Sequence, residues 1–229
     1  FYIYSLWMII MIQKIKLLIL SSIFVSPWIM ANTSANIKIT GDIKQPTCLV
    51  NGNKQSDVIF ELADISPKDL NQTSYISLKS NVSKNVTVSC DAETYLTYRA
   101  VDTYMNTPWP AFVSPDYFNM VLSDNSNKSV GLVLFSTSDV TIDSKPAFIA
   151  RDGVTANNTV VRKNILNGWA TKDSTVFANR LTAGKIFSAN FTAAGGYLSS
   201  INQFNTDGID LSSKVNYQAE VVLAFNFGI

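Results

Sequence analysis

Carboxylates are the side chains in this sequence whose spacing could support catalysis, and they form two close pairs. Asp91 is followed by Glu93, and Asp207 by Asp210. Two carboxyl groups on either side of a sugar can act as acid and base, or as nucleophile, in glycoside hydrolysis. Carboxylates this close to a loop or a strand end more often stay solvated or cap a turn. We therefore expect structural roles for both pairs.

Histidine, the commonest general base, is missing from the 229-residue chain. Serine and cysteine nucleophiles that depend on histidine are excluded, and so are the usual zinc sites. The stretch SDNSNKS (123–129) lacks the later glutamate and the glycine of a calcium loop and is expected to form a turn. No glycine-rich phosphate-binding motif occurs. The sequence predicts a protein without catalytic residues, metal or cofactor, and not an enzyme.

Aromatic side chains between the β-type runs suggest a second kind of chemistry, the stacking of sugars. Trp109 lies between two prolines in TPWPAF, and Trp169 lies in LNGWATK. Tryptophan in such a place either binds carbohydrate or covers the end of a hydrophobic core. We expect the second role, and keep sugar binding as an alternative.

Two cysteines, Cys48 and Cys90, are the only thiols in the chain. Their spacing does not fit a CxxC redox motif, and without histidine they make a poor zinc site. In an exported protein the two are expected to form a disulfide. Closing a loop of this length would stabilise the fold by about 4 kcal/mol in the chain-entropy description.

Export is predicted from residues 1–31. Lys14 and Lys16 precede an apolar run from Leu17 to Met30 that is interrupted by Pro27, and a small residue follows at Ala31. This run is shorter than the ~20 residues that span a bilayer, so we expect a cleaved signal peptide and no stable membrane anchor. Met11 is an alternative translation start, and cleavage after Ala35 is the alternative cleavage site.

The overall composition argues against nucleic acid as a binding partner. The net charge is +1, only 15% of residues are charged and 47% are hydrophobic. Such a chain can fill a core, and it offers no basic patch for nucleic acid.

Short β-type runs separated by turn residues make up the chain after residue 31, with no long helical pattern. Regular spacing of such runs is typical of an all-β sandwich or barrel. We expect one domain over 46–229, a helical turn within 65–71, a turn or bulge at AAGGY (193–197), and long connections at 102–128 and 150–183. The expected strands are 58–62, 75–80, 85–90, 95–101, 130–136, 185–191 and 215–227.

The last of these runs has the clearest pattern. From Val215 to Phe227 every odd position is apolar, which predicts one long strand with one buried face. Its last inward-facing residues are Val221, Leu223, Phe225 and Phe227.

A second alternating segment, ANIKITGDIKQPTC, lies ahead of the first cysteine. Ile37 and Ile39 point one way, Gly41 and Ile43 continue the pattern, and Pro46 ends it. A patterned strand beside a free end suggests β-augmentation, in which an extended segment of one chain covers the open sheet edge of another.

These residues carry a family resemblance. An apolar-x-apolar-x-Gly-x-apolar run with a cysteine seven residues after the glycine, a second cysteine ending NVTVSC (85–90) and an alternating C-terminal strand resemble subunits of chaperone–usher fimbriae. The stretch CDAETYLTYRAVD (90–102) further resembles a branch of fimbrial-type periplasmic proteins with longer bodies. The chain departs from the family pattern at Asn216, where glycine is common, and in its last residues, Phe227-Gly228-Ile229, which lack the usual penultimate tyrosine.

The resemblance implies an immunoglobulin-like, pilin-type β-sandwich that lacks its final strand. Residues 32–45 would then donate a strand through Ile37, Ile39, Gly41 and Ile43. The 221–227 strand would border the acceptor groove and contact a periplasmic chaperone. An outer-membrane usher and neighbouring subunits would be the other partners, and a surface fimbrium the destination after the periplasm. A non-polymerising periplasmic or tip-located binding protein, similar to an adhesin, is the alternative.

Overall fold

The computed structural model describes residues 38, 45–62, 65–151, 153–172 and 174–228. The chain divides into two compact units, Phe1–Ile43 and Lys44–Ile229, and each is considered by itself. The predicted signal peptide, 1–31, and the predicted donor residues Ile37, Ile39, Gly41 and Ile43 lie outside the described residues. The described strands and helices all belong to the second unit.

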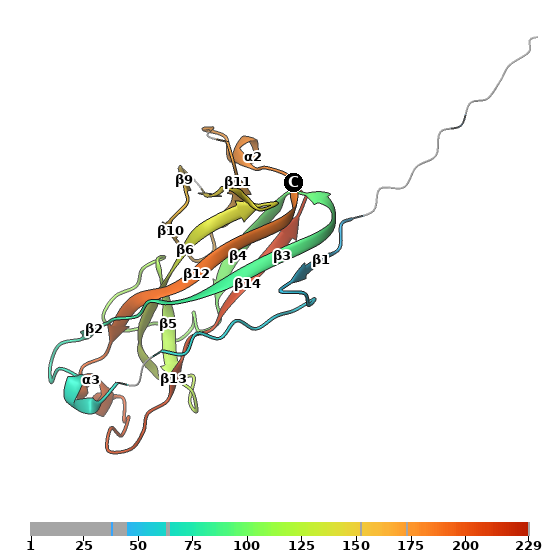
Figure 1. The fold of residues 1–229 in the computed structure, drawn as a ribbon. Coiled ribbons are helices and arrows are strands. Elements are labelled where there is room, and N and C mark those ends of the chain that lie inside the picture. Colours follow the sequence, from blue (N-terminus) through green and yellow to red (C-terminus); the bar gives the residue numbers. More distant parts are fainter. Residues whose placement is uncertain (1–37, 39–44, 63–64, 152, 173, 229) are drawn as a thin grey trace, which may run out of the picture. The chain divides into compact units, whose positions relative to one another are not determined.

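This unit is mostly β, with two antiparallel sheets and very little helix (Figure 1). The first sheet has the order β1-β3-β12-β6-β5-β13, and three short strands, β2, β7 and β10, also pair with β12 or β6. Its strands are β1 (Cys48–Val50), β2 (Ile76–Leu78), β3 (Val82–Thr94), β5 (Tyr117–Leu122), β6 (Ser129–Ile142), β7 (Lys145–Pro146), β10 (Thr159–Val160), β12 (Gly184–Leu198) and β13 (Tyr217–Gln218).

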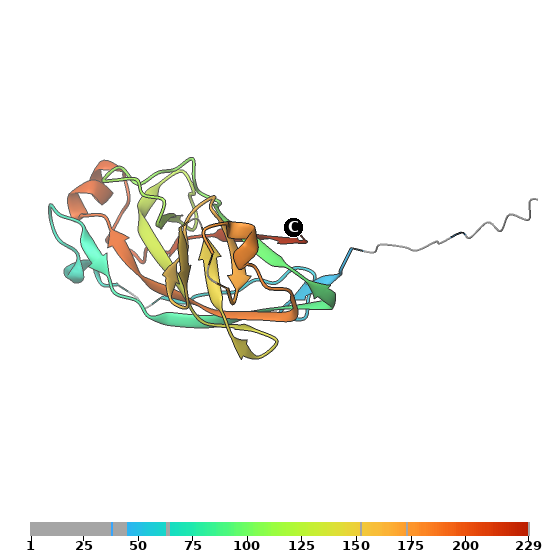
Figure 2. The same cartoon turned by 90° about the horizontal axis from the view of Figure 1, so that it is seen from above.

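The second sheet has the order β14-β4-β11-β8-β9. Its strands are β4 (Leu96–Asp102), β8 (Phe148–Arg151), β9 (Val154–Ala156), β11 (Leu166–Ala170) and β14 (Val221–Phe227). Figure 2 views the same strands from above. The helical segments are the 3-10 turn η1 (Pro67–Asp69), α2 (Phe177–Arg180) and α3 (Ile201–Thr206).

Aromatic side chains from both sheets meet in one core. Tyr98 of β4 lies 6.1 Å from Phe191 of β12, and Trp169 of β11 lies 5.9 Å from Phe187 of β12, measured between ring centroids. Trp169, Tyr98 and Phe187 are fully buried. The alternating strands thus fold so that apolar faces of both sheets contact each other.

Glycine permits the close contact of β6 and β12, the two longest strands. A Cβ at Gly131 would lie 2.0 Å from the carbonyl oxygen of Tyr197. The register of β12 against β6 shifts between Ala193 and Gly195, where Gly195 has a φ of +127°. The AAGGY stretch is therefore a β-bulge, one of the two expected structures.

Several predicted strands form as expected, within β2, β3, β4, β6 and β12. The 215–227 strand is not continuous: β13 pairs with β5 in the first sheet, and β14 pairs with β4 in the second. The alternation of burial nevertheless continues from Val215 to Phe225 across the change of sheet. The prediction of a 58–62 strand is wrong, because this segment forms no strand and pairs with none of the strands in the described part of the chain.

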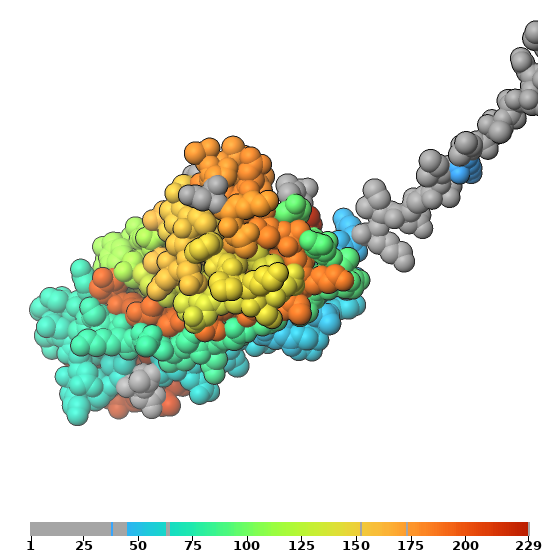
Figure 3. Space-filling model, turned by 45° about the horizontal axis from the view of Figure 1, so that its top comes forward, coloured from blue at the N-terminus to red at the C-terminus, as the bar shows by residue number. Residues whose placement is uncertain are grey.

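The two long connections contain strands that the sequence pattern did not reveal. β5 lies within 102–128, and β8 to β11 lie within or next to 150–183. In the space-filling view of Figure 3, yellow and orange segments lie next to one another on the upper part of the unit. The 150–183 stretch therefore contributes short strands to both sheets, with turns and the helix α2 between them.

Candidate functional site

The C-terminal strand β14 has one free edge. Among the described residues, it ends the second sheet and pairs with β4 alone. The Thr103 amide donates to the Glu220 carbonyl at 3.1 Å, and the Gly228 amide donates to the Tyr95 carbonyl at 3.1 Å. Because bonded pairs alternate in antiparallel strands, the even residues of β14 bond to β4. The amides and carbonyls of the odd residues, from Val221 to Phe227, point to the free edge.

The side chains of the same odd residues face the core. Val221, Leu223 and Phe225 are half-buried and pack against it, whereas the even neighbours are exposed. The ring of Phe225 lies 6.0 Å from that of Tyr98. Phe227, expected on the same face, is 40% exposed. An inward apolar row therefore lies beside an unpaired backbone.

A second half-buried segment, 56–62, shows the same incomplete burial. Val58, Phe60 and Leu62 pack against the core, while Ile59 is 69% exposed. The Phe60 ring lies 5.3 Å from that of Phe135 on β6. Among the described residues, no backbone hydrogen bond joins 57–62 to a strand. We call β14 the open edge and treat 56–62 as a second segment that lacks a strand partner among the described residues.

The disulfide fixes the start of the folded unit. Cys48 and Cys90 are joined, as the cysteine count led us to expect, and they are register partners of β1 and β3. The Thr47 amide donates to Asp91 Oδ1 at 2.8 Å, and the Asp91 amide donates to the Thr47 carbonyl at 3.0 Å. The backbone at Thr47 is thereby anchored at the edge of the first sheet.

Three of the four candidate catalytic carboxylates have structural bonding partners. Asp91 holds the backbone at Thr47, and Asp207 accepts from Gln203 Nε2 at 3.1 and 3.0 Å. Hydrogen bonds from the amide and hydroxyl of Ser212 lower the pKa of Asp210 below its usual value. Glu93 is exposed on β3. The bonding of these residues matches the capping and solvated roles expected for them.

Neither tryptophan presents a face for sugar stacking. Trp169 lies in β11, not in a loop, is fully buried, and donates Nε1–H to the Ser188 carbonyl at 3.2 Å. Trp109 lies in a loop but is 2% exposed and donates Nε1–H to Ser199 Oγ at 2.7 Å. The sugar-binding role considered for these two rings is excluded by their burial.

Sequence reasoning missed a buried polar network at the end of β4. Asp102 Oδ2 accepts from the Asn119 amide at 3.0 Å, from Asn119 Nδ2 at 2.9 Å and from Lys163 Nζ at 3.3 Å. Asp102 Oδ1 accepts from the Tyr104 amide at 3.1 Å. Nothing in the sequence signals this network, because its members are separated by up to 61 residues.

Two buried groups of the second sheet have shifted pKa values. Burial raises the pKa of the Tyr98 hydroxyl well above its ordinary value. Burial, followed by the charge of Arg162, lowers the pKa of Arg151. Tyr98 of β4 is the register partner of Asn167 in β11, and the neighbouring residue Gly168 is the partner of Ala150 in β8, next to Arg151. The two groups therefore lie on β4 and β8, the two strands that flank β11 in the second sheet.

Within the described part of the chain, no group of three or more histidine, cysteine, aspartate or glutamate residues could hold a metal ion. No helix there is long and apolar enough to cross a membrane. Comparisons with protein-family models, curated proteins and solved structures find no match for this chain.

Proposed function

We propose that this chain is a structural fimbrial subunit whose open edge accepts a β-strand from another molecule. One observation carries the proposal: odd residues of β14 present both unpaired backbone groups and half-buried apolar side chains. An exposed edge of this kind favours pairing with another chain. A donated strand would supply hydrogen bonds to the backbone and apolar side chains to the core.

Residues 32–45 have the alternating apolar pattern that a strand needs in order to pair with such an edge. Ile37 and Ile39 are apolar at alternate positions, Gly41 removes a side chain and Ile43 continues the row. Full burial of one isoleucine side chain contributes roughly 1.5–3 kcal/mol. Several such contacts, together with main-chain bonds, suffice for a stable interface. The donor would come from a neighbouring subunit, and its transient substitute from a periplasmic chaperone.

The fold proposed on this basis is an immunoglobulin-like, pilin-type sandwich that lacks one strand. Export through a signal peptide, assembly at an outer-membrane usher and display on a surface fimbrium follow from it. The role is structural rather than catalytic. The disulfide between Cys48 and Cys90 is consistent with folding in an oxidising compartment.

A synthetic peptide of residues 32–45 tests the proposal on a chain variant that lacks the same segment and therefore cannot donate to itself. The peptide is expected to bind one to one and to raise the melting temperature. A peptide with Ile39→Asp should not bind, because it would place an unpaired charge in an apolar site. A peptide with Lys38→Asp, changed on the opposite face, is the matched control and should bind.

A soluble, stable monomer that lacks residues 32–45 and binds no such peptide would contradict the polymerising function. It would favour the alternative, a non-polymerising or tip-located binding protein on the same fold. That alternative is supported by one observation, a cavity among the loops that carry Asn106, Asn127 and Asp207.

A further inference from the structure

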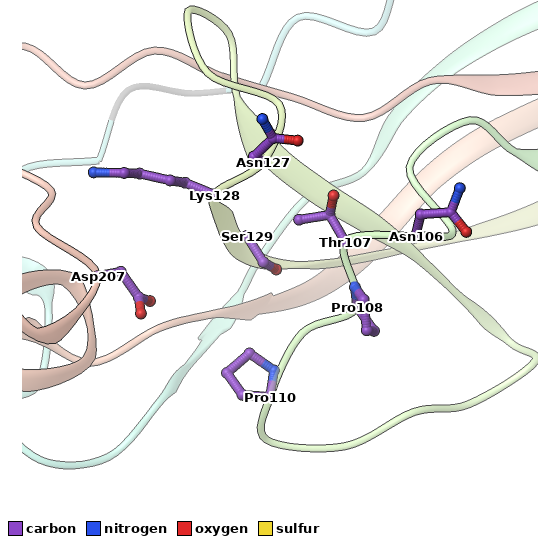
Figure 4. Close-up of a pocket in the computed structure, with 8 residues that line it drawn as sticks. All are labelled: Asn106, Thr107, Pro108, Pro110, Asn127, Lys128, Ser129 and Asp207. Atoms are coloured by element: carbon purple, nitrogen blue, oxygen red, sulfur yellow. The ribbon is translucent and has the colours of Figure 1, made fainter.

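A polar cavity of about 540 Å³ lies among three loops outside the open edge (Figure 4). One loop precedes β5, the second joins β5 to β6, and the third follows α3. Its volume is in the range of small-molecule sites. The lining residues are Asn106, Thr107, Pro108, Pro110, Asn127, Lys128, Ser129 and Asp207.

The first of these loops is held in place from both ends. At its start, Asp102 accepts from the Tyr104 amide, and Asn119 Nδ2 donates to the Tyr104 carbonyl at 3.1 Å. At Trp109, the backbone amide donates to Asn119 Oδ1 at 3.4 Å, and the buried indole bonds to Ser199. Between these anchors stand residues 106–108. A site on a fixed loop loses little conformational entropy when a ligand binds.

The polar groups around the cavity keep unused hydrogen-bonding capacity. Among the described residues, no hydrogen bond reaches the side-chain amide of Asn106 or Asn127. Lys128 Nζ donates once, to the Gly208 carbonyl at 2.9 Å, and has two further protons. Asp207 is oriented by Gln203 and can accept more bonds. The lining therefore offers donors and acceptors together, with one positive and one negative charge.

An aromatic ring lies beside this lining. A smaller cavity of about 180 Å³ shares Pro110 with the first and is lined by Tyr75, Ser199 and Gln203. Tyr75 is 51% exposed. Its ring is fixed edge-on by Trp109 at 5.4 Å and by Tyr197 at 5.3 Å. A half-exposed ring of fixed orientation offers an apolar face next to polar groups.

We propose that these two cavities form a binding site for a neutral oligosaccharide. Sugar hydroxyls donate and accept at once, which matches amides beside a carboxylate and an ammonium. The C–H face of a sugar matches the Tyr75 ring. A polyanion would find a single lysine, and an apolar ligand would leave the lining amides unpaired. The inference goes beyond the structural function and does not depend on the open edge.

An array of immobilised neutral oligosaccharides, probed with the full exported chain, tests the site. A bound sugar is then titrated against Asn127→Ala, Asp207→Asn and Tyr75→Ala. Each is expected to weaken binding about tenfold, as for loss of one hydrogen bond to a charged group or of one stacking ring. Matched controls that lie outside the lining, Asn205→Ala and Asp124→Asn, should bind as the unchanged chain does.

Three outcomes would overturn the site: no oligosaccharide bound, equal binding by the lining variants and the controls, or binding of a zwitterionic dipeptide in preference to sugars. Binding of the 32–45 peptide should stay unchanged when the same substitutions are made in the chain that lacks residues 32–45. That measurement shows whether a lost signal reflects a misfolded variant. It also separates failure of this site from failure of the strand-accepting function.

Discussion

The paired centre of the first sheet and the open edge use the same alternating pattern with different results. In β12 the inward residues Phe187 and Ala189 are fully buried, because β3 and β6 pair on either side of them. In β14 the inward residues Val221 and Leu223 remain half-buried, because β4 is its one neighbouring strand in the described part of the chain. An alternating sequence determines which face turns inward. The number of neighbouring strands determines how completely that face is buried.

The largest difference in stability between the two regions is expected when a large aromatic side chain is removed from each. Trp169→Ala should lower the free energy of unfolding by about 3–5 kcal/mol, because the ring is fully buried. Phe225→Ala at the open edge should cost only about 1 kcal/mol in the free chain, since its ring is only partly buried. Urea unfolding measures both. Equal losses would contradict the difference in burial between the two regions.

Removal of the disulfide is expected to cost about 2–4 kcal/mol, because it releases a loop of separation 42. The double variant Cys48→Ser, Cys90→Ser and the control Ser89→Ala on the same strand can be compared by thermal unfolding. A loss no greater than that of the control would show that the bond does not anchor β1. Binding of the 32–45 peptide should weaken with the double variant, since β1 directly precedes the 56–62 segment.

A third comparison concerns two glycines, one where β6 and β12 are in close contact and one beside the open edge. Gly131→Ala should destabilise by about 1–3 kcal/mol, because its Cβ would meet the Tyr197 carbonyl oxygen at 2.0 Å. Gly228→Ala, next to the open edge, has no atom within 4 Å and only a positive φ of +88°. It should cost about 1 kcal/mol. A Gly131→Ala chain as stable as the parent in urea would disprove the close approach of β6 and β12.

Alkaline pH should destabilise the core through Tyr98. Its pKa is raised on folding, so the folded state holds a proton that the unfolded state releases above about pH 10. The free energy of unfolding should therefore fall with rising pH above that point, by up to about 1.4 kcal/mol per pH unit from this group. Tyr98→Phe should remove that part of the slope, whereas an unchanged slope would show that Tyr98 does not contribute.

The sequence alone predicted the β class and the inward rows, since these depend on local alternation. It missed β5 because Asn119 interrupts the apolar run with a polar residue that is needed by Asp102. It missed β11 because Asn167-Gly168 is typical of a turn. Gly168 is instead required where the Leu181 side chain would lie 2.4 Å from a Cβ.

The position of a functional site could be predicted from the sequence only where its residues are close together in the chain. The inward row of the open edge can be seen in the order of residues from Val215 onward. The cavity cannot, because Asn106, Asn127 and Asp207 converge from three separate loops. Whether 56–62 has a neighbouring strand likewise depends on how the whole chain folds, not on the residues of this segment. A β-type run predicts extended backbone, but not whether a neighbouring strand exists to pair with it.

Amide hydrogen exchange, resolved by residue, tests the central claim that the open edge accepts a strand. In the chain without residues 32–45, the amides of Val221, Leu223 and Phe225 should exchange fast, and those of Val222 and Ala224 slowly. Adding the 32–45 peptide should protect the odd amides and slow exchange in 57–62. Protection of the odd amides before any peptide is added, or no change after it, would contradict the account.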